Sequence, residues 1–353
     1  MKILILSASI GSGHTKAAEA IGKVLNHDCE IIDFTAKEIS KLNWITKKIY
    51  LSALKFIPDL YDRIYKFMGA RQVGTLTRFL TSTLMYFPFV RLLKKFQPDV
   101  VICTHPFPEA AASLWKFLHA KSAKKFLLAA VLTDYSLHEI WIYSEVDIYF
   151  VATEKMKAEL AALSVPNQEI HATGIPIGLE FGAKKNSPHE KFTILIMGGG
   201  LGLGSIEETL EDLENISARL KIIVVTGQNE KLFSRLKNFR SKHETKFFGN
   251  VDNISDLMSA ADLLITKPGA LTMTEAFAVG LPMILHAPIP GPEAKNADYA
   301  IKNFAAFSAG DKKISAVVES FLKVPELLAE MKLSAKKIAK PDAALAIAKI
   351  VSG

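Results

Sequence analysis

Short apolar segments alternate with stretches of helical periodicity along most of the chain. The apolar segments are rich in Ile, Leu and Val and too short for helices, which is typical of strands buried on both faces of a sheet. They occupy residues 2–8, 29–34, 100–104, 125–133 and 148–152, and then 192–197, 221–226, 246–248, 263–265 and 282–285. This alternation predicts parallel sheets covered by helices, and the two series predict an α/β fold of two doubly wound domains.

The region between the two series is rich in Gly, Pro and Lys and loses apolar periodicity. We therefore predict an N-terminal domain over 1–175, a linker over 176–190 and a C-terminal domain over 191–340, which suits a length of 353 residues. Ala and Ile recur at helical spacing after Pro341, so residues 341–353 are predicted to form a last helix that packs back on the first domain.

The turn after segment 263–265 is a first candidate for ligand binding. Lys267, Pro268 and Gly269 lie between that segment and an apolar stretch of helical spacing. A helix that opens at such a turn presents free N–H groups and a partial positive charge, which suits a phosphate. The sequence thus predicts a diphosphate-binding loop.

The N-terminus repeats this plan. The turn Gly11-Ser12-Gly13 separates an apolar segment from a helix predicted over 14–25, which places His14 in the first helical turn. Ligands of open α/β sheets bind at the carboxyl ends of the strands, so both turns lie where a nucleotide or a sugar is expected.

A Gly-rich segment, 198–204, follows the first strand of the second series. Glycine permits positive φ and a close approach of the backbone to a ligand, which makes Gly199 and Gly200 candidates. A dinucleotide-binding interpretation stays open, although the spacing departs from G-x-G-x-x-G. No Gly-Lys-Ser/Thr follows, so a Walker P-loop is excluded.

Further histidines follow strands of the first series. His105 comes directly after segment 100–104, and Asp134 and His138 follow segment 125–133. Asp134 and His138 are spaced to share a helical face, as metal ligands or as hydrogen-bonded partners, but without further clustered ligands we predict no metal site. Together with His14, these histidines favour one shared polar wall. A structural hydrogen bond is the simpler interpretation of any single one.

Two polar residues mark another predicted helix start. Glu293 and Asn296 come shortly after segment 282–285, where their side chains are placed to bind sugar hydroxyls. A simple helix cap, with Glu complementing the dipole, is the alternative.

Positive charge is concentrated in one region. The net charge is +7, and residues 37–95 hold twelve Lys and Arg against three Asp and Glu, interleaved with aromatic side chains. Such a mixture suits contact with anionic lipid headgroups. A solvated helical face over an aromatic core is the plain alternative. We expect no nucleic acid as partner, because no nucleic-acid-binding module accompanies the basic residues.

The lengths of the apolar runs argue against a membrane-spanning protein and against secretion. None approaches the roughly 18 residues of a membrane span, and the first ten residues lack the core of a signal peptide. Two cysteines, Cys29 and Cys103, are too few for a disulfide framework and suit a reducing compartment. We expect a cytoplasmic protein that associates peripherally with the inner face of the cell membrane.

Taken in order, these motifs resemble glycosyltransferase family 28, in particular monogalactosyldiacylglycerol synthase and the processive diacylglycerol glucosyltransferases, with the lipid-II-forming muramyl glycosyltransferases as more distant relatives. The resemblance covers nearly the whole chain and rests on order and spacing. The matching residues are Gly11 to His14, Ala17, Ala18, Pro98, Asp99, His105, Pro106, Thr133, Asp134, His138, Trp141, Val146, Asp147, Val151 to Thr153, Gly174 to Ile177, Lys267 to Gly269, Glu275, Ala276, Pro290, Gly291, Glu293 and Asn296.

The resemblance implies a GT-B fold, in which two Rossmann-like domains face a cleft. It implies inverting transfer of a hexose from a UDP-sugar to diacylglycerol or a glycosyl-diacylglycerol, without a cofactor or bound metal. His14 resembles the general base, since a histidine can accept a hydroxyl proton near neutral pH. Asp134 is the rival base or the group that orients the histidine. His105, His138 and Trp141 lie on the acceptor side.

By the same resemblance, the C-terminal domain holds the UDP-sugar. The backbone of Val251 meets the uracil, Glu275 the ribose, and Glu293 and Asn296 the sugar. The other donor-side residues are Gly13, Gly199, Gly200, Lys267, Gly269, Ala270, Leu271 and Thr272.

Two departures from the family pattern bear on the donor. Pro292 stands where the family usually has Gln, and it offers neither a side-chain hydrogen bond nor an N–H. Glucose, galactose and an N-acetylhexosamine therefore all stay open. Ala270 replaces a common Gly but keeps its N–H.

Three alternatives stay open from the sequence. One is a transferase of the same fold with a polyprenyl-linked acceptor. Another is the non-hydrolysing UDP-N-acetylglucosamine 2-epimerase, which shares the two-domain plan but lacks the basic lipid-facing segment. The third is a non-catalytic protein that binds nucleotide sugars.

Overall fold

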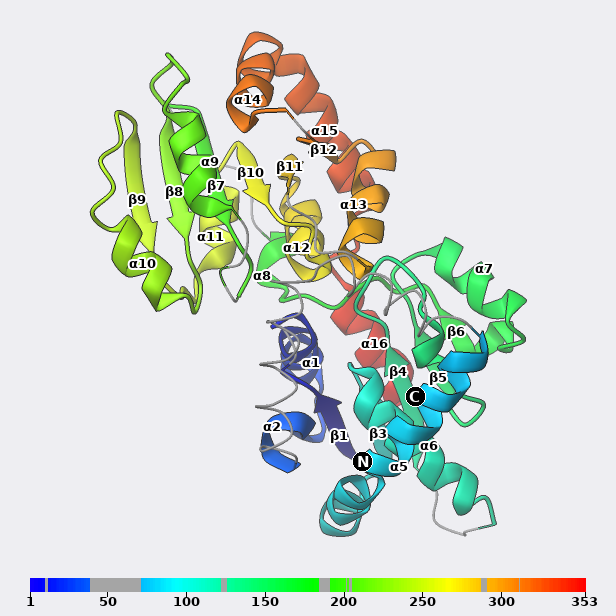
Figure 1. The fold of residues 1–353 in the computed structure, drawn as a ribbon. Coiled ribbons are helices and arrows are strands. Elements are labelled where there is room, and N and C mark those ends of the chain that lie inside the picture. The colour runs from blue at the N-terminus through cyan, green and yellow to red at the C-terminus, as the bar shows by residue number, and fades with distance from the viewer. Residues whose placement is uncertain are drawn as a thin grey trace. The chain divides into compact units, whose positions relative to one another are not determined.

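The computed structural model describes residues 1–9, 12–38, 71–121, 126–183, 191–200, 202, 205–286, 291–310 and 312–353 (Figure 1). For residues 71–77 and 79 it describes the backbone alone. Residues 39–70 of the basic region, residues 184–190 of the predicted linker, and Gly11 and Pro290 of the matching motifs lie outside these ranges.

The chain divides into two compact units. The first comprises Met1–Ile177, Pro290–Pro292 and Asp342–Gly353, and the second comprises Gly178–Ile289 and Glu293–Pro341. Each unit contains one six-stranded sheet in which every pair of neighbouring strands is parallel. The predicted α/β fold of two doubly wound domains is confirmed.

The sheet of the first unit has the strand order β2-β1-β3-β4-β5-β6. Its strands are β1 (Lys2–Ser7), β2 (Asp28–Asp33), β3 (Val100–Cys103), β4 (Leu127–Val131), β5 (Ile148–Phe150) and β6 (Ile170–His171). Ile3 to Leu6 of β1 are all buried, because helices cover both faces of the sheet. This is why the central strands are continuous apolar runs rather than alternating ones.

The described helices of the first unit are α1 (Gly13–Val24), α2 (Phe34–Glu38), α5 (Arg71–Phe96), α6 (Pro106–Leu118), η1 (Glu139–Trp141), α7 (Glu154–Ala162), η2 (Asn167–Glu169) and α16 (Ala343–Ser352). Two pairs of these helices pack against the sheet. The helices α1 and α16 pack together, and Ile21 and Ile347 share one core with Ile5 and Ile102 of the sheet. The helices α5 and α6 pack against each other, and α6 contacts β3 and β4. The last helix thus belongs to the first unit, although it is the last element of the chain.

The sheet of the second unit has the order β12-β11-β10-β7-β8-β9. Its strands are β7 (Thr193–Met197), β8 (Lys221–Val225), β9 (Glu244–Phe248), β10 (Leu263–Thr266), β11 (Met283–Leu285) and β12 (Ala306–Ser308). Its helices are α8 (Glu180–Ala183), α9 (Ile206–Leu213), α10 (Glu230–Leu236), α11 (Ile254–Ser259), α12 (Ala270–Val279), α13 (Pro292–Lys302), α14 (Ile314–Lys323) and α15 (Pro325–Ile338). Ile194, Ile222 and Val318 are among the fully buried side chains of its core.

Ten apolar segments predict ten strands, and each overlaps one strand of the structure. The prediction misses β6 and β12, which have two and three residues and lie at the edges of their sheets. An edge strand needs less apolar sequence because only one side of it pairs. In the described part of the chain, no helix combines the length and the apolar content that crossing a membrane requires.

Glu109 is an unusual member of the first unit's core. It lies in the first turn of α6, its side chain is fully buried, and neither carboxylate oxygen has a hydrogen-bond partner. Burial raises its pKa well above the usual range, since a carboxylate loses its hydration there. Burial therefore favours the protonated, neutral form of the Glu109 carboxyl group.

We expect Glu109→Gln to remove a pH-dependent loss of stability. Because the pKa is raised in the folded state, the folded chain keeps this proton while the unfolded chain releases it above about pH 4.3. The free energy of unfolding then falls by about 1.4 kcal/mol per pH unit. Glu109→Gln cannot ionise, so its stability advantage over the wild type should grow with pH in a series of urea denaturations. Glu330→Gln, at an exposed position, is the control. A constant difference between Glu109→Gln and the wild type would contradict this expectation.

Candidate functional site

His14 lies where three neighbouring strands of the first unit end. It is in the first turn of α1, after β1, and its Nδ1 is 2.8 Å from the carbonyl oxygen of Thr104, which follows β3. The same nitrogen is 2.7 Å from Oγ1 of Thr133, which follows β4. The Thr104 hydroxyl in turn donates to the carbonyl oxygen of His14 at 3.0 Å. Because β1, β3 and β4 are adjacent and parallel, their carboxyl ends bring these residues together.

The electrostatics of this corner favour a neutral imidazole. Desolvation lowers the pKa of His14, and this effect outweighs the opposing pull of the Asp134 carboxylate and the Thr104 carbonyl. The residue as a whole is nevertheless only half-buried. A lowered pKa favours the uncharged ring near neutral pH, which is the form that can accept a proton.

His105 contacts His14 directly. Their rings meet edge to face with centroids 4.6 Å apart. His105 also forms the N-cap of α6, where its Nδ1 accepts a hydrogen bond from the N–H of Phe107 at 3.1 Å. Burial and the neighbouring His14 lower its pKa well below the usual range, so it is neutral. His105 therefore serves the fold and the site together.

His138 has a local structural role. Its Nδ1 accepts from the N–H of Ile140 at 3.2 Å and caps the short helix η1, whose last residue, Trp141, is buried. The helical face proposed for Asp134 and His138 does not form, because the chain between β4 and η1 is a loop and the backbone of His138 is extended. Within the described ranges, no three His, Cys, Asp or Glu side chains gather closely enough to hold a metal ion.

The diphosphate-binding loop predicted in the second unit has the expected form. Helix α12 begins at Ala270, directly after Pro268 and Gly269, and its first backbone hydrogen bond runs from Met273 N–H to the Gly269 carbonyl at 3.0 Å. The N–H groups of Ala270, Leu271 and Thr272 precede that bond and have no acceptor within the helix. The loop thus offers several aligned donors to an anion.

Lys267 brings a positive charge to the same place. Its Nζ forms an ion pair with the carboxylate of Glu293, and both side chains are only 15% exposed. A Cβ built on Gly199 would lie 3.6 Å from Cε of Lys267, so the Gly-rich loop after β7 runs beside this lysine. The loops after β7 and β10 therefore meet at one corner of the second unit, because those strands are neighbours.

The Gly-rich loop owes part of its composition to packing. Gly202 has a positive φ of 58°, and a Cβ there would lie 2.0 Å from the Thr226 carbonyl oxygen. Gly200 accepts from the N–H of Gln228 at 3.0 Å, and Gly202 accepts from the Asn229 side chain at 3.2 Å. The sequence predicts that these glycines allow a ligand to approach. In the structure, Gly202 instead allows close packing against the loop after β8. Gly199 and Gly200 retain partly exposed backbone.

The remaining donor-side residues lie on neighbouring elements of the second unit. Glu275 is buried on α12 and Asn296 is buried on α13, whereas Val251 lies partly exposed between β9 and α11. Glu293 is in the first turn of α13, whose first residue is Pro292. A proline fits there because the first helical position needs no N–H donor.

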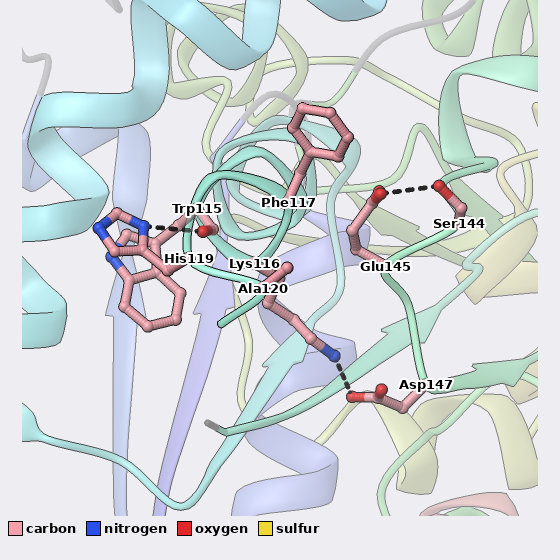
Figure 2. A pocket seen from close by; sticks show the side chains of 8 residues that line it. All are labelled: Trp115, Lys116, Phe117, His119, Ala120, Ser144, Glu145 and Asp147. Carbon is pink, nitrogen blue, oxygen red and sulfur yellow. Dashed lines mark hydrogen bonds and ion pairs between the residues drawn. The ribbon is translucent and has the colours of Figure 1, made fainter. Parts of the chain in front are cut away.

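None of the predicted site residues lines the pocket in Figure 2. Its volume is 280 Å³, and it is lined by Trp115, Lys116, Phe117, His119, Ala120, Ser144, Glu145 and Asp147. Lys116 pairs with Asp147 at 2.5 Å, and the rings of Trp115 and His119 stack 4.5 Å apart. Asp147 directly precedes β5, so the pocket lies at the edge of the sheet opposite to His14.

Thr104 and Thr133 were not assigned to the site from the sequence. Each is the last residue of a predicted apolar segment and precedes a candidate residue, His105 or Asp134. A hydroxyl at that position in two neighbouring strands is the signal that points to them. The pairing with His14 itself spans 90 and 119 residues of sequence, which no local pattern reports.

Two family models together cover almost the whole chain. Residues 14–177 match monogalactosyldiacylglycerol synthase, and residues 193–351 match the C-terminal domain of glycosyltransferase family 28. A processive diacylglycerol beta-glucosyltransferase of Bacillus cereus (strain AH187) is 33% identical over 366 aligned residues, covering 97% of this chain and 91% of the relative.

Solved structures agree on the fold. MurG of Acinetobacter baumannii aligns with a TM-score of 0.63 at 16% identity, over 100% of this chain and 99% of that one. Anabaena Alr3699/HepE, solved in complex with UDP, aligns with a TM-score of 0.60 at 12% identity over 100% of both chains. The chain has the GT-B fold of these glycosyltransferases.

We expect the pKa of His14, followed by NMR titration of its ring protons, to lie below the ordinary value of about 6.5. Asp134→Asn should lower this pKa further, because it removes the carboxylate that favours the charged ring. Asp147→Asn, at the opposite edge of the same sheet, is the matched control and should leave the pKa unchanged. An unshifted pKa in Asp134→Asn would mean that the two groups do not interact.

Proposed function

The chain belongs to the glycosyltransferase family that contains monogalactosyldiacylglycerol synthase and the processive diacylglycerol glucosyltransferases, and from this membership we propose that it transfers a hexose from a UDP-sugar to diacylglycerol or a glycosyl-diacylglycerol. The observation that carries the proposal is the 33% identity to a processive diacylglycerol beta-glucosyltransferase over 97% of the chain. Likeness over both units makes a shared reaction the simplest interpretation.

His14 is the proposed general base. As the acceptor hydroxyl attacks the anomeric carbon, the bond from that carbon to the diphosphate breaks, and the hydroxyl proton moves to the imidazole. The lowered pKa of His14 keeps it ready to accept this proton at neutral pH. The positive charge that then develops on the ring is stabilised by the Asp134 carboxylate. We therefore assign Asp134 an electrostatic role and not the role of the base.

The second unit supplies the leaving-group chemistry. UDP departs with additional negative charge, and the N–H groups at the start of α12 together with Lys267 can stabilise that charge. We propose that these groups do the work that a divalent cation does in other sugar transferases, so that the reaction needs no cofactor. Val251, Glu275, Glu293 and Asn296 take the roles that the family assigns to their positions.

Helix α5 supports contact with a membrane. Leu80, Leu84 and Phe87 follow one another on one face and are 58%, 57% and 75% exposed, whereas Phe89 on the opposite face is buried. Arg91 and the exposed Lys94 and Lys95 continue on this side toward the end of the helix. Apolar side chains beside exposed cations are suited to an anionic bilayer surface, where the lipid acceptor resides. We propose peripheral association with the cytoplasmic face of the membrane.

The decisive assay measures UDP release with UDP-glucose, UDP-galactose or UDP-N-acetylglucosamine, with and without diacylglycerol in anionic micelles. We expect one of the three donors to give UDP release, and we expect that release to require diacylglycerol. His14→Ala should reduce the rate by at least about a hundredfold while UDP binding persists, because general-base catalysis is worth that much. His119→Ala, the same change at the far edge of the sheet, should retain activity. Release without acceptor, or activity with a polyprenyl-linked acceptor alone, would refute the proposal.

We expect the double variant Leu84→Ser/Phe87→Ser to bind anionic vesicles at least about tenfold more weakly than the wild type in a pelleting assay, because it removes apolar area from the bilayer contact. Val324→Ser/Leu333→Ser, which changes two exposed apolar residues of the second unit, is the control. Equal binding of both double variants would exclude α5 from the membrane contact.

A further inference from the structure

The ring of His14 has two nitrogens, and only an unprotonated one can act as a base. The Thr104 carbonyl oxygen lies 2.8 Å from Nδ1, and a carbonyl oxygen can only accept a hydrogen bond. This contact therefore favours the tautomer with the proton on Nδ1. In the other tautomer, two lone pairs would face each other at that distance, in a place where Thr104 is fully buried and no water can separate them.

Thr133 completes this arrangement. Its Oγ1 is 2.7 Å from the same nitrogen, so the Nδ1 proton is shared between the carbonyl and the hydroxyl oxygen. Thr133 is 6% exposed and directly follows Leu132, whose N–H donates to the Phe150 carbonyl at 2.9 Å. The hydroxyl is thus held in place by the sheet rather than by a flexible loop.

The neighbours of the ring limit its rotation. Because His105 accepts the Phe107 N–H at its own Nδ1, it has its proton on Nε2 and a fixed orientation. Its ring packs edge to face on His14 at 4.6 Å. The Asp134 carboxylate acts on His14 through its charge, while Thr104 and Thr133 occupy Nδ1. Orientation and charge compensation are therefore supplied by different residues.

We propose that Thr133 is a positioning residue of the reaction. With the Thr104 carbonyl, its hydroxyl holds His14 in the Nδ1–H tautomer, so that Nε2 receives the proton of the acceptor hydroxyl. This inference rests on the proposed function, because it specifies which atom of the proposed base reacts. When the proton arrives at Nε2, Nδ1–H becomes a charged donor, and its two oxygen acceptors stabilise the imidazolium.

The test combines a spectroscopic and a kinetic measurement on the full chain. Long-range ¹H–¹⁵N NMR of the protein labelled at histidine identifies the protonated nitrogen, and His14→Gln assigns its signals among the nine histidines. We expect the wild type to be protonated at Nδ1 and unprotonated at Nε2. Thr133→Val, which keeps the side-chain shape, should increase the Nε2–H population and lower kcat about fivefold, the worth of one hydrogen bond, with the KM for the donor unchanged. Thr133→Ser retains the hydroxyl and should restore both.

Two results would overturn the proposal: an Nε2–H tautomer in the wild type, or a Thr133→Val variant with the wild-type tautomer and kcat. If Thr133→Val does not fold, Thr133→Ala and Thr133→Ser provide the same comparison. Failure of the proposed function is a separate outcome, because the tautomer is observed without any substrate. A wild type that is protonated at Nδ1 but transfers no sugar would retain the positioning of His14 and remove its assigned reaction.

Discussion

Parallel strand pairing is the constraint on which the rest of this structure depends. Parallel neighbours end at the same edge of a sheet, so the residues that follow them meet there regardless of their separation along the chain. In the first unit this edge joins His14, Thr104 and Thr133, which follow β1, β3 and β4. The strands themselves contribute apolar side chains to the core. The polar candidate site residues lie just beyond the ends of the strands.

The second unit uses the same constraint for a different purpose. Its central neighbours β7 and β10 end beside each other, which places the Gly-rich loop against Lys267 and the start of α12. Helix N-termini and a lysine make that corner attractive to an anion, whereas the first unit's corner holds a neutral imidazole. In the proposed reaction, one architecture thus supplies the proton acceptor in one unit and the anion site in the other.

The first unit has buried polar groups in two different settings, the carboxyl edge of its sheet and its core. At the carboxyl edge of its sheet, His14 and His105 have hydrogen-bond partners that determine their protonation. Within the core, Glu109 is buried without such a partner, and burial raises its pKa. In both situations burial favours the neutral form of the side chain. The exposed apolar face of α5 belongs to the same unit, so the proposed base and the proposed lipid contact lie in one compact unit.

Local sequence determined much of this protein. Runs of Ile, Leu and Val define the central strands, and the turn at Pro268 and Gly269 marks the start of α12, because these features depend on side chains a few residues apart. The order of motifs likewise indicates the family. The loop between Asp134 and His138, the edge strands β6 and β12, and the packing role of Gly202 were decided by tertiary structure. So was the assignment of Thr104 and Thr133 to His14, since hydrogen bonds that span 90 and 119 residues exist only after the sheet has brought its strand ends together.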